Sequence, residues 1–130
     1  MKRKKPSQRF AAKLLFQFRV LAPNAPGKRR ICEYRILNFL SASGPTALAE
    51  ANRRGIAAQY SYRNSAGRTV HFEFVGVQDL LCLDPECQPD EVWYDIVQLV
   101  RPMERKNKLI PKESELNALQ SHERAAPLRP

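Results

Sequence analysis

The stretch NSAGRTVHFEFVGVQDL, residues Asn64 to Leu80, decides the fold. An asparagine followed shortly by a glycine, between two alternating runs, is typical of a β-hairpin, here with a loop of about four residues. In the second run Val70, Phe72 and Phe74 alternate with polar residues, so we expect them to face the core. Gly76 indicates a bulge, because the apolar phase shifts after it.

Two further strands are predicted upstream of this hairpin. Residues 10–20 alternate between apolar side chains and positions that include Lys13, Gln17 and Arg19, which is the pattern of a half-buried strand. A loop rich in proline and glycine follows. Residues 31–40 then predict a second strand, paired antiparallel with the first. We assign its core face to Cys32, Tyr34 and Ile36, and its solvent face to Glu33 and Arg35.

Between the second strand and the hairpin, the apolar period changes to that of a helix. Ser43 is a suitable N-cap, and Pro45 suits the first turn, where its missing N–H costs nothing. The apolar stripe of this helix consists of small residues, so the helix can lie close to a sheet. Gly55 indicates either that close contact or an early helix end, and the sequence leaves both open.

The remaining chain predicts one more strand and a polar arm. The run VWYDIVQLV, from Val92, alternates like a strand, and residues 111–119 could form a short helix. The predicted class is α+β: an antiparallel sheet of four to five strands with one main helix packed on one face, plus a C-terminal arm. We expect a disordered basic N-terminus at 1–8, one domain at 9–101, and the arm at 102–130.

The net charge of +9 lies mainly at the two ends of the chain. Residues 1–9 carry +5, residues 10–100 carry +1, and residues 101–130 carry +3. A nucleic-acid-binding domain normally carries its basic residues on the folded surface, so the nearly neutral body favours other partners. Association with nucleic acid is the alternative, through Lys2, Arg3, Lys4, Lys5, Arg53, Arg54, Arg63 and Arg68.

Several classes of protein and site are not indicated by the sequence. Lys13, Gln17 and Arg19 interrupt any signal-peptide core, and no run approaches the roughly 20 apolar residues of a membrane span. We therefore expect a cytoplasmic protein with reduced cysteines and no membrane partner. Cys82 and Cys87 lack a second ligand pair on the same face, so we expect neither a metal nor a cofactor.

If every strand turns its apolar stripe to the helix, the other sheet face collects a mixed set of polar side chains and one tryptophan. Such a face is either plainly solvated or a protein-binding surface centred on Trp93. A third possibility is an enzyme that uses His71 as a base oriented by Glu73, but no nucleophile or enclosed pocket accompanies them. The candidate binding residues are Arg19, Arg35, His71, Glu73, Trp93 and Asp95, and we predict no catalytic residues.

The order FAAKLLFQF, an alanine-rich helix, YSYRNSAGRTVHFEFVGVQDLLCL and DEVWYDI resembles a small bacterial family, domain of unknown function 4288. The resemblance covers about residues 10–96, and its most specific part is the Y-x-N-x-x-G-x-x-V-x-F-x-F-V-G-V pattern from Tyr62 to Val77. It implies a compact bacterial α+β domain and no established activity. The sequence therefore predicts a non-catalytic interaction or accessory module of the bacterial cytosol, whose partner is another protein or a second copy of itself.

Overall fold

The computed structural model describes residues 7–22, 29–85 and 87–120. The expected basic N-terminus lies largely outside these residues, as do 121–130 at the far end. The chain divides into two compact units, which are described separately. The first ends at Tyr94 and the second begins at Asp95.

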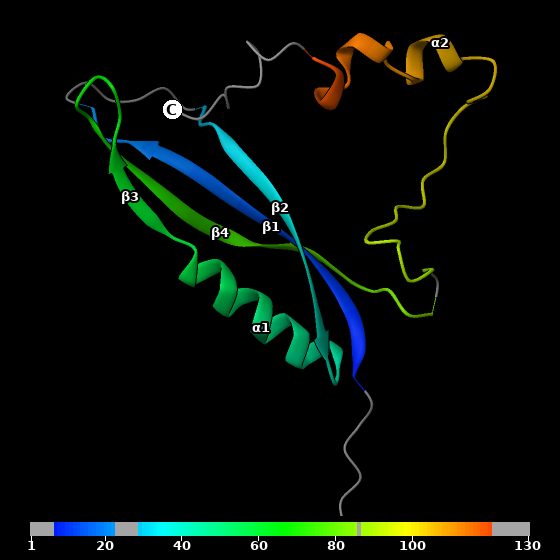
Figure 1. Cartoon of the computed structure of the whole chain (residues 1–130), viewed down its shortest axis with the longest axis horizontal. Coiled ribbons are helices and arrows are strands. Elements are labelled where there is room, and N and C mark those ends of the chain that lie inside the picture. Colours follow the sequence, from blue (N-terminus) through cyan, green and yellow to red (C-terminus); the bar gives the residue numbers. More distant parts are fainter. Residues whose placement is uncertain (1–6, 23–28, 86, 121–130) are drawn as a thin grey trace, which may run out of the picture. The chain divides into compact units, whose positions relative to one another are not determined.

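The first unit is an antiparallel sheet with one helix. Its strands follow the order β2-β1-β4-β3, and their bounds are Gln8–Val20 for β1, Cys32–Ser41 for β2, Tyr60–Arg63 for β3 and Thr69–Cys82 for β4. Helix α1, Gly44–Ala57, packs on one face of this curled sheet (Figure 1). The predicted α+β class, with an antiparallel sheet and one main helix, is confirmed. We call the face opposite α1 the outer face.

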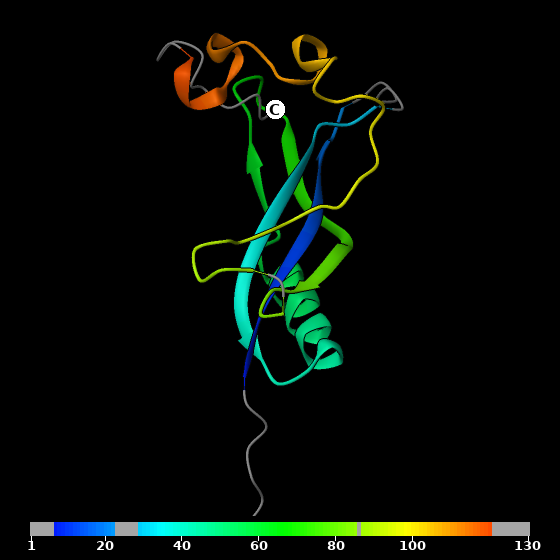
Figure 2. The ribbon, with the colours of Figure 1, turned by 90° about the vertical axis from the view of Figure 1, so that its right-hand side faces the viewer.

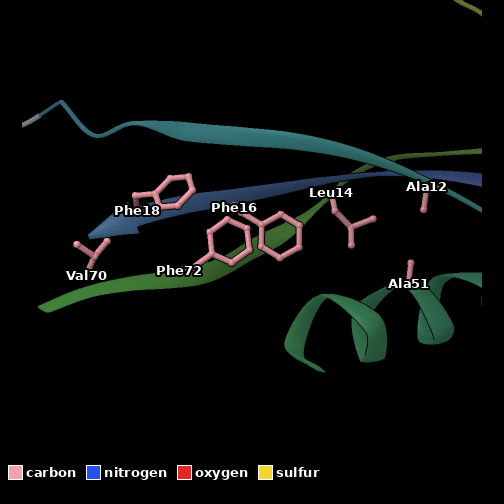
Figure 3. Close-up of a cluster of buried hydrophobic side chains, with 7 residues drawn as sticks. All are labelled: Ala12, Leu14, Phe16, Phe18, Ala51, Val70 and Phe72. Carbon is pink, nitrogen blue, oxygen red and sulfur yellow. The ribbon is translucent and has the colours of Figure 1, made fainter. Parts of the chain in front are cut away.

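The core lies between α1 and the alternating apolar side chains of β1 and β4. The rings of Phe16 and Phe72 stack with centroids 4.6 Å apart, and Phe18 tilts against Phe72 at 4.9 Å. Figure 3 shows these rings with Leu14, Val70 and two alanines that contribute to the same buried cluster. The hairpin sequence thus places its phenylalanines in the core, as predicted.

Small residues allow α1 to approach the sheet closely. Ala47, Ala51 and Gly55 are its buried residues. A Cβ at position 55 would lie 2.5 Å from a ring carbon of Phe74. The helix continues to Ala57, so Gly55 serves the close contact and does not end the helix. The Ser43 side chain accepts the N–H of Thr46, which confirms the predicted cap.

The turn between β3 and β4 has the predicted chemistry. The Asn64 Oδ1 accepts the main-chain N–H groups of Ala66 and Arg68, each at 3.0 Å. Gly67 has a φ of 76°, a conformation that glycine adopts without the steric cost of a side chain. Two register shifts in the pairing of β1 with β4 flank Gly76, which accounts for the phase change seen in the sequence.

The two faces of β2 are the reverse of those predicted. Glu33 and Arg35 lie opposite Phe16 and Leu14 on the side that carries α1, whereas Tyr34 is exposed on the outer face. The Arg35 guanidinium lies over the rings of Phe16 and Phe72, with its central carbon 5.1 and 4.8 Å from their centroids. Its charge is balanced by Glu33. Because stacking and ion pairing satisfy Arg35, a charged pair occupies the side assigned to apolar residues.

Arg9 holds the segment that follows β4. Its main-chain N–H and Nε bind the carboxylate of Asp84, and its guanidinium reaches the carbonyl oxygens of Gln88 and Pro89, each at 3.1 Å. The segment then passes beside Leu40 on β2, on the opposite side of the sheet from α1 (Figure 2). One arginine therefore fixes the path of the chain as it leaves the sheet.

One prediction about the later chain is wrong. Residues 91–99 contain no strand, although their apolar residues alternate, so the described sheet has four strands. The second unit contains a short helix α2, Lys106–Leu109, and two single 3₁₀ turns, η1 at Glu113–Glu115 and η2 at Asn117–Leu119. Both 3₁₀ turns lie within 111–119, where the sequence could form a short helix. None of the three elements buries a residue.

Candidate functional site

Strand register brings a group of polar side chains together on the outer face. Gln17 lies opposite Glu73, Arg19 lies opposite His71, and Ser61 of β3 lies opposite His71 on its other side. Directly opposed residues of antiparallel strands point to the same face, so three strands contribute to one surface. We call these five residues the polar cluster.

A bidentate ion pair forms the centre of the polar cluster. The Arg19 Nε donates to the Glu73 Oε1 at 2.8 Å, and its Nη2 donates to Oε2 at 3.0 Å. The Gln17 side-chain amide donates to the same Oε1 at 3.0 Å, and its own oxygen accepts from Arg30 at 2.9 Å. The Arg19 hydrogen bonds are the main reason that the pKa of Glu73 lies below its usual range. Glu73 is therefore an ionised, oriented carboxylate at neutral pH.

His71 contacts the edge strand on the other side of the cluster. Its Nδ1 lies 2.6 Å from the Ser61 Oγ, in an open hollow also lined by Gln59 and Tyr60. A serine beside a histidine can in principle be activated as a nucleophile. Here the oxygens of Glu73 accept hydrogen bonds from Arg19 and Gln17, and the main-chain N–H of Phe74 donates to Gln59. The geometry therefore gives the enzyme hypothesis little support.

The remaining candidates for the binding face are not in the predicted place. Arg35 lies on the α1 side of the sheet, over the phenylalanine rings, because β2 is reversed. Trp93 and Asp95 lie in a segment without regular structure, so no strand directs them to the outer face. The break between the two compact units also falls between them. The structure thus brings together Arg19, His71 and Glu73, and places Arg35 on the opposite side of the sheet.

The basic residues of the alternative site are partly neutralised. On α1, both Arg53 and Arg54 bind the carboxylate of Glu50, at 2.6 and 2.8 Å. These hydrogen bonds lower the pKa of Glu50 to about 2. Arg63 and Arg68 are exposed at the hairpin end of β3 and β4, and Lys2 to Lys5 fall outside the described residues. Among these candidates, the described surface thus offers two exposed hairpin arginines and a helix on which one glutamate offsets one of two arginine charges.

We compared the chain with family models, curated proteins and solved structures. No match was found in any of the three comparisons. The resemblance to domain of unknown function 4288 stays a prediction. No helix in residues 7–22, 29–85 and 87–120 is long and apolar enough to cross a membrane. In the same residues no three potential ligands from histidine, cysteine, aspartate and glutamate gather at one point.

Sequence reasoning missed the apolar part of the outer face. Tyr34, Ile36 and Leu40 of β2 expose 55, 44 and 66 % of their surface there, and we call these three residues the apolar ridge. The Lys13 ammonium lies 4.8 Å from the centroid of the Tyr34 ring and shields only part of the ridge. The alternation within 31–40 is compatible with either face of the strand pointing to the core. Only the length of β2 and its position at the edge of the sheet, which the structure supplies, show that its apolar side is exposed.

Proposed function

We propose that this chain is a non-catalytic protein-interaction module that binds a partner through the outer face of its sheet. The observation that carries the proposal is the exposed apolar ridge on the same sheet face as the pre-formed polar cluster. A sheet face needed only for folding would expose polar side chains along an edge strand. Exposed apolar residues beside oriented polar groups are typical of surfaces that bind other proteins.

The polar cluster supports binding without creating a strong electrostatic field. Arg19 and Glu73 neutralise each other, so a partner that covers them does not bury an unpaired charge. Their hydrogen-bonding side chains already hold one geometry, which lowers the entropy lost on binding. Tyrosine and arginine are also among the residue types that contribute most to interface affinity. The cluster would fix the orientation of a partner, and the ridge would supply most of the affinity.

The cellular setting of the proposal is that of a bacterial accessory protein in the cytoplasm. Three cysteines without disulfides fit a reducing compartment, since Cys32, Cys82 and Cys87 are all free. Cys32 is exposed and belongs to β2, so the core position predicted for it is wrong. The resemblance to a bacterial family supports the same setting.

A comparison of two matched variants tests this function. Tyr34→Lys adds a charge to the apolar ridge, and Leu48→Lys adds the same charge to an exposed position of α1, where Leu48 exposes 42 % of its surface. Partners are recovered from lysate by cross-linking and mass spectrometry. We expect the wild type and Leu48→Lys to recover the same partner, and Tyr34→Lys and Arg19→Ala to lose it.

Recovery of the same proteins by all four chains would contradict the proposal. A chain without residues 102–130 separates the contribution of the arm from that of the sheet face. Retention of the partner by this chain would assign binding to the face alone, and its loss would add the arm to the interface. Circular dichroism establishes that each variant keeps the fold.

Association with nucleic acid is the second candidate, and the exposed pair Arg63 and Arg68 favours it. Contacts with phosphates weaken steeply with salt, so titration against nucleic acid at several salt concentrations measures their number. If this is the function, replacing both hairpin arginines by alanine should reduce the salt slope by about 2, one per lost phosphate contact. A slope abolished by removing only Lys2 to Lys5 would assign the binding to the terminal segment.

A further inference from the structure

In the described part of the chain, no strand pairs with the outer edge of β2. This strand lies at one end of the strand order and pairs with β1 over ten residues without a register shift. An edge strand presents unpaired main-chain N–H and C=O groups, and proteins usually protect such edges with short strands, bulges, proline, lysine or charged side chains that point inward. The sequence of β2, CEYRILNFLS, contains neither proline nor lysine, and its pairing contains no bulge. Its two inward-pointing charges, Glu33 and Arg35, neutralise each other as an ion pair. This edge therefore has fewer protective features than is usual for a strand of its length.

The opposite edge of the same sheet is protected. The strand at this edge, β3, has only four residues. The neighbouring strand, β4, contains two register shifts in its pairing with β1. Tyr60, the first residue of β3, pairs with Phe72. Beyond this pair, the Phe74 N–H donates to the side-chain oxygen of Gln59 at 2.9 Å. The contrast between the two edges indicates that the open edge of β2 serves a purpose.

One hydrogen bond shows which groups of β2 point outward. The Phe18 N–H donates to the Ile31 carbonyl at 2.9 Å, and these residues continue the register of β1 with β2. In antiparallel pairs, hydrogen-bonded positions alternate along the strand, so the odd-numbered residues of β2 bind β1. The outward groups belong to the even-numbered residues, Cys32, Tyr34, Ile36, Asn38 and Leu40, whose side chains lie on the outer face.

We propose that this edge pairs antiparallel with β2 of a second copy, with the two-fold axis at Tyr34. The outward-pointing groups of the two copies can pair only if even-numbered residues oppose even-numbered residues. The two-fold axis must then pass through a residue and not between two residues, which leaves few possible registers. An axis at Glu33 opposes two carboxylates, and an axis at Arg35 opposes two guanidinium groups. An axis at Tyr34 places Glu33 of each copy opposite Arg35 of the other. Opposite charges facing each other across strands stabilise a pair, and like charges destabilise it.

The same register also matches the outer face. Tyr34 meets Tyr34 of the second copy, and Cys32 meets Ile36, so part of the apolar ridge is shared between the two chains. The product is one continuous eight-stranded sheet with both α1 helices on the same side. This inference goes beyond the proposed function and does not depend on it, because the pairing is carried by main-chain groups at the edge of β2.

Sedimentation equilibrium of the purified full chain tests the pairing. The chain should pass from monomer to dimer as its concentration rises. Ile36→Pro removes an outward N–H while leaving the hydrogen bonds of β2 to β1 intact, which edge strands tolerate. We expect this variant to weaken dimerisation by roughly 100-fold, since two symmetry-related hydrogen bonds are lost at about tenfold each. A monomer at every concentration, or a dimer unchanged by Ile36→Pro, would overturn the proposal.

Cysteine cross-linking tests the register without relying on a proline. In a chain with the three native cysteines replaced by serine, Tyr34→Cys places two thiols across the axis. Cα atoms of such a pair lie about 5.5 Å apart, within the range of a disulfide. The control, Ile36→Cys, points the same way but stands about 14 Å from its equivalent. We expect oxidation to yield a covalent dimer only with Tyr34→Cys. Cross-linking through Ile36→Cys instead, or with neither variant, would show that this register is wrong.

Discussion

At the scale of single residues, Gly55 marks the closest approach of α1 to the sheet. Gly55→Val would place a branched side chain where even a Cβ meets the Phe74 ring at 2.5 Å. Overpacking of this kind costs about 1–3 kcal/mol, and the helix propensity recovered by replacing glycine is about 0.5 kcal/mol. We therefore expect a net loss of about 2 kcal/mol in the free energy of unfolding, measured by urea denaturation.

The matched control for this experiment is Gly76→Val. A Cβ at Gly76 would meet no atom within 4 Å, and the residue lies in a strand, where valine is favoured. Its unfolding free energy should stay within about 0.5 kcal/mol of the wild type. Equal losses at both positions would show that the destabilisation comes from the loss of glycine and not from the Phe74 contact.

Glu50 predicts a pH dependence of stability. Hydrogen bonds from Arg53 and Arg54 lower its pKa from 4.5 to about 2 in the folded chain. Because the folded value is the lower one, the stabilisation is complete above pH 4.5 and is lost as the pH falls toward 2. Urea unfolding between pH 6 and 2 should show this loss, and Glu50→Gln should reduce it.

The carboxylate itself can be followed by nuclear magnetic resonance. We expect the Glu50 resonance to titrate near pH 2, and Arg53→Ala to raise its midpoint, because Arg53 makes the largest contribution to the shift. A wild-type midpoint near 4.5 would show that the two arginines do not hold this carboxylate in solution.

Single residues also explain what the sequence could reveal. The hairpin glycine, the Asn64 turn and the core phenylalanines follow local rules, and all were predicted. The inward position of Arg35 was not predicted. Its guanidinium contacts Phe16 of β1, Phe72 of β4 and Glu33 of β2, and only the folded sheet brings these three residues together. Alternation alone cannot say which of two mixed faces will be buried. Arg19, His71 and Glu73 were placed correctly because β1 and β4 have an unmistakable apolar side.

At the scale of elements, the segment after β4 depends on Arg9. Arg9→Lys keeps the charge but loses the planar fork that reaches Asp84, Gln88 and Pro89 together. We expect faster amide hydrogen exchange at Cys87, whose N–H donates to the Leu83 carbonyl at 2.8 Å. Exchange in the middle of β1 should not change, since those hydrogen bonds do not involve the Arg9 side chain.

Arg68→Lys, on the exposed hairpin turn, is the control for the Arg9 variant. It should leave exchange at Cys87 as in the wild type. If Arg9→Lys also leaves it unchanged, the path of the chain after β4 is fixed by packing of the buried Leu83 and not by the arginine.

The strand predicted from the alternation within residues 91–99 is absent, and the reason lies at the scale of elements. Their alternation of apolar and polar residues matches a strand, but a strand requires a neighbour to pair with. The described sheet runs from β2 to β3 and uses none of these residues. The alternation in a sequence indicates which residues would share one face of a strand. Whether that segment pairs with a sheet depends on where the preceding part of the chain leads it. In this protein Arg9 and Asp84 direct that path.

At the scale of the whole molecule, the hydrophobic core formed by the described residues lies in the first unit. Its buried apolar residues run from Phe10 to Leu83, and the elements of the second unit bury none. A chain that ends at Tyr94 should therefore fold, with an unfolding free energy within about 0.5 kcal/mol of the full chain. Its m-value in urea should also be nearly the same, because m reports the surface exposed on unfolding.

Urea denaturation followed by circular dichroism compares the shortened chain with the full one. A clear fall in both the midpoint and the m-value on shortening would show that residues beyond Tyr94 unfold together with the sheet, which contradicts the division into two units. The shortened chain also sharpens the dimer experiment. If it dimerises as the full chain does, the second unit takes no part in the contact between the two copies.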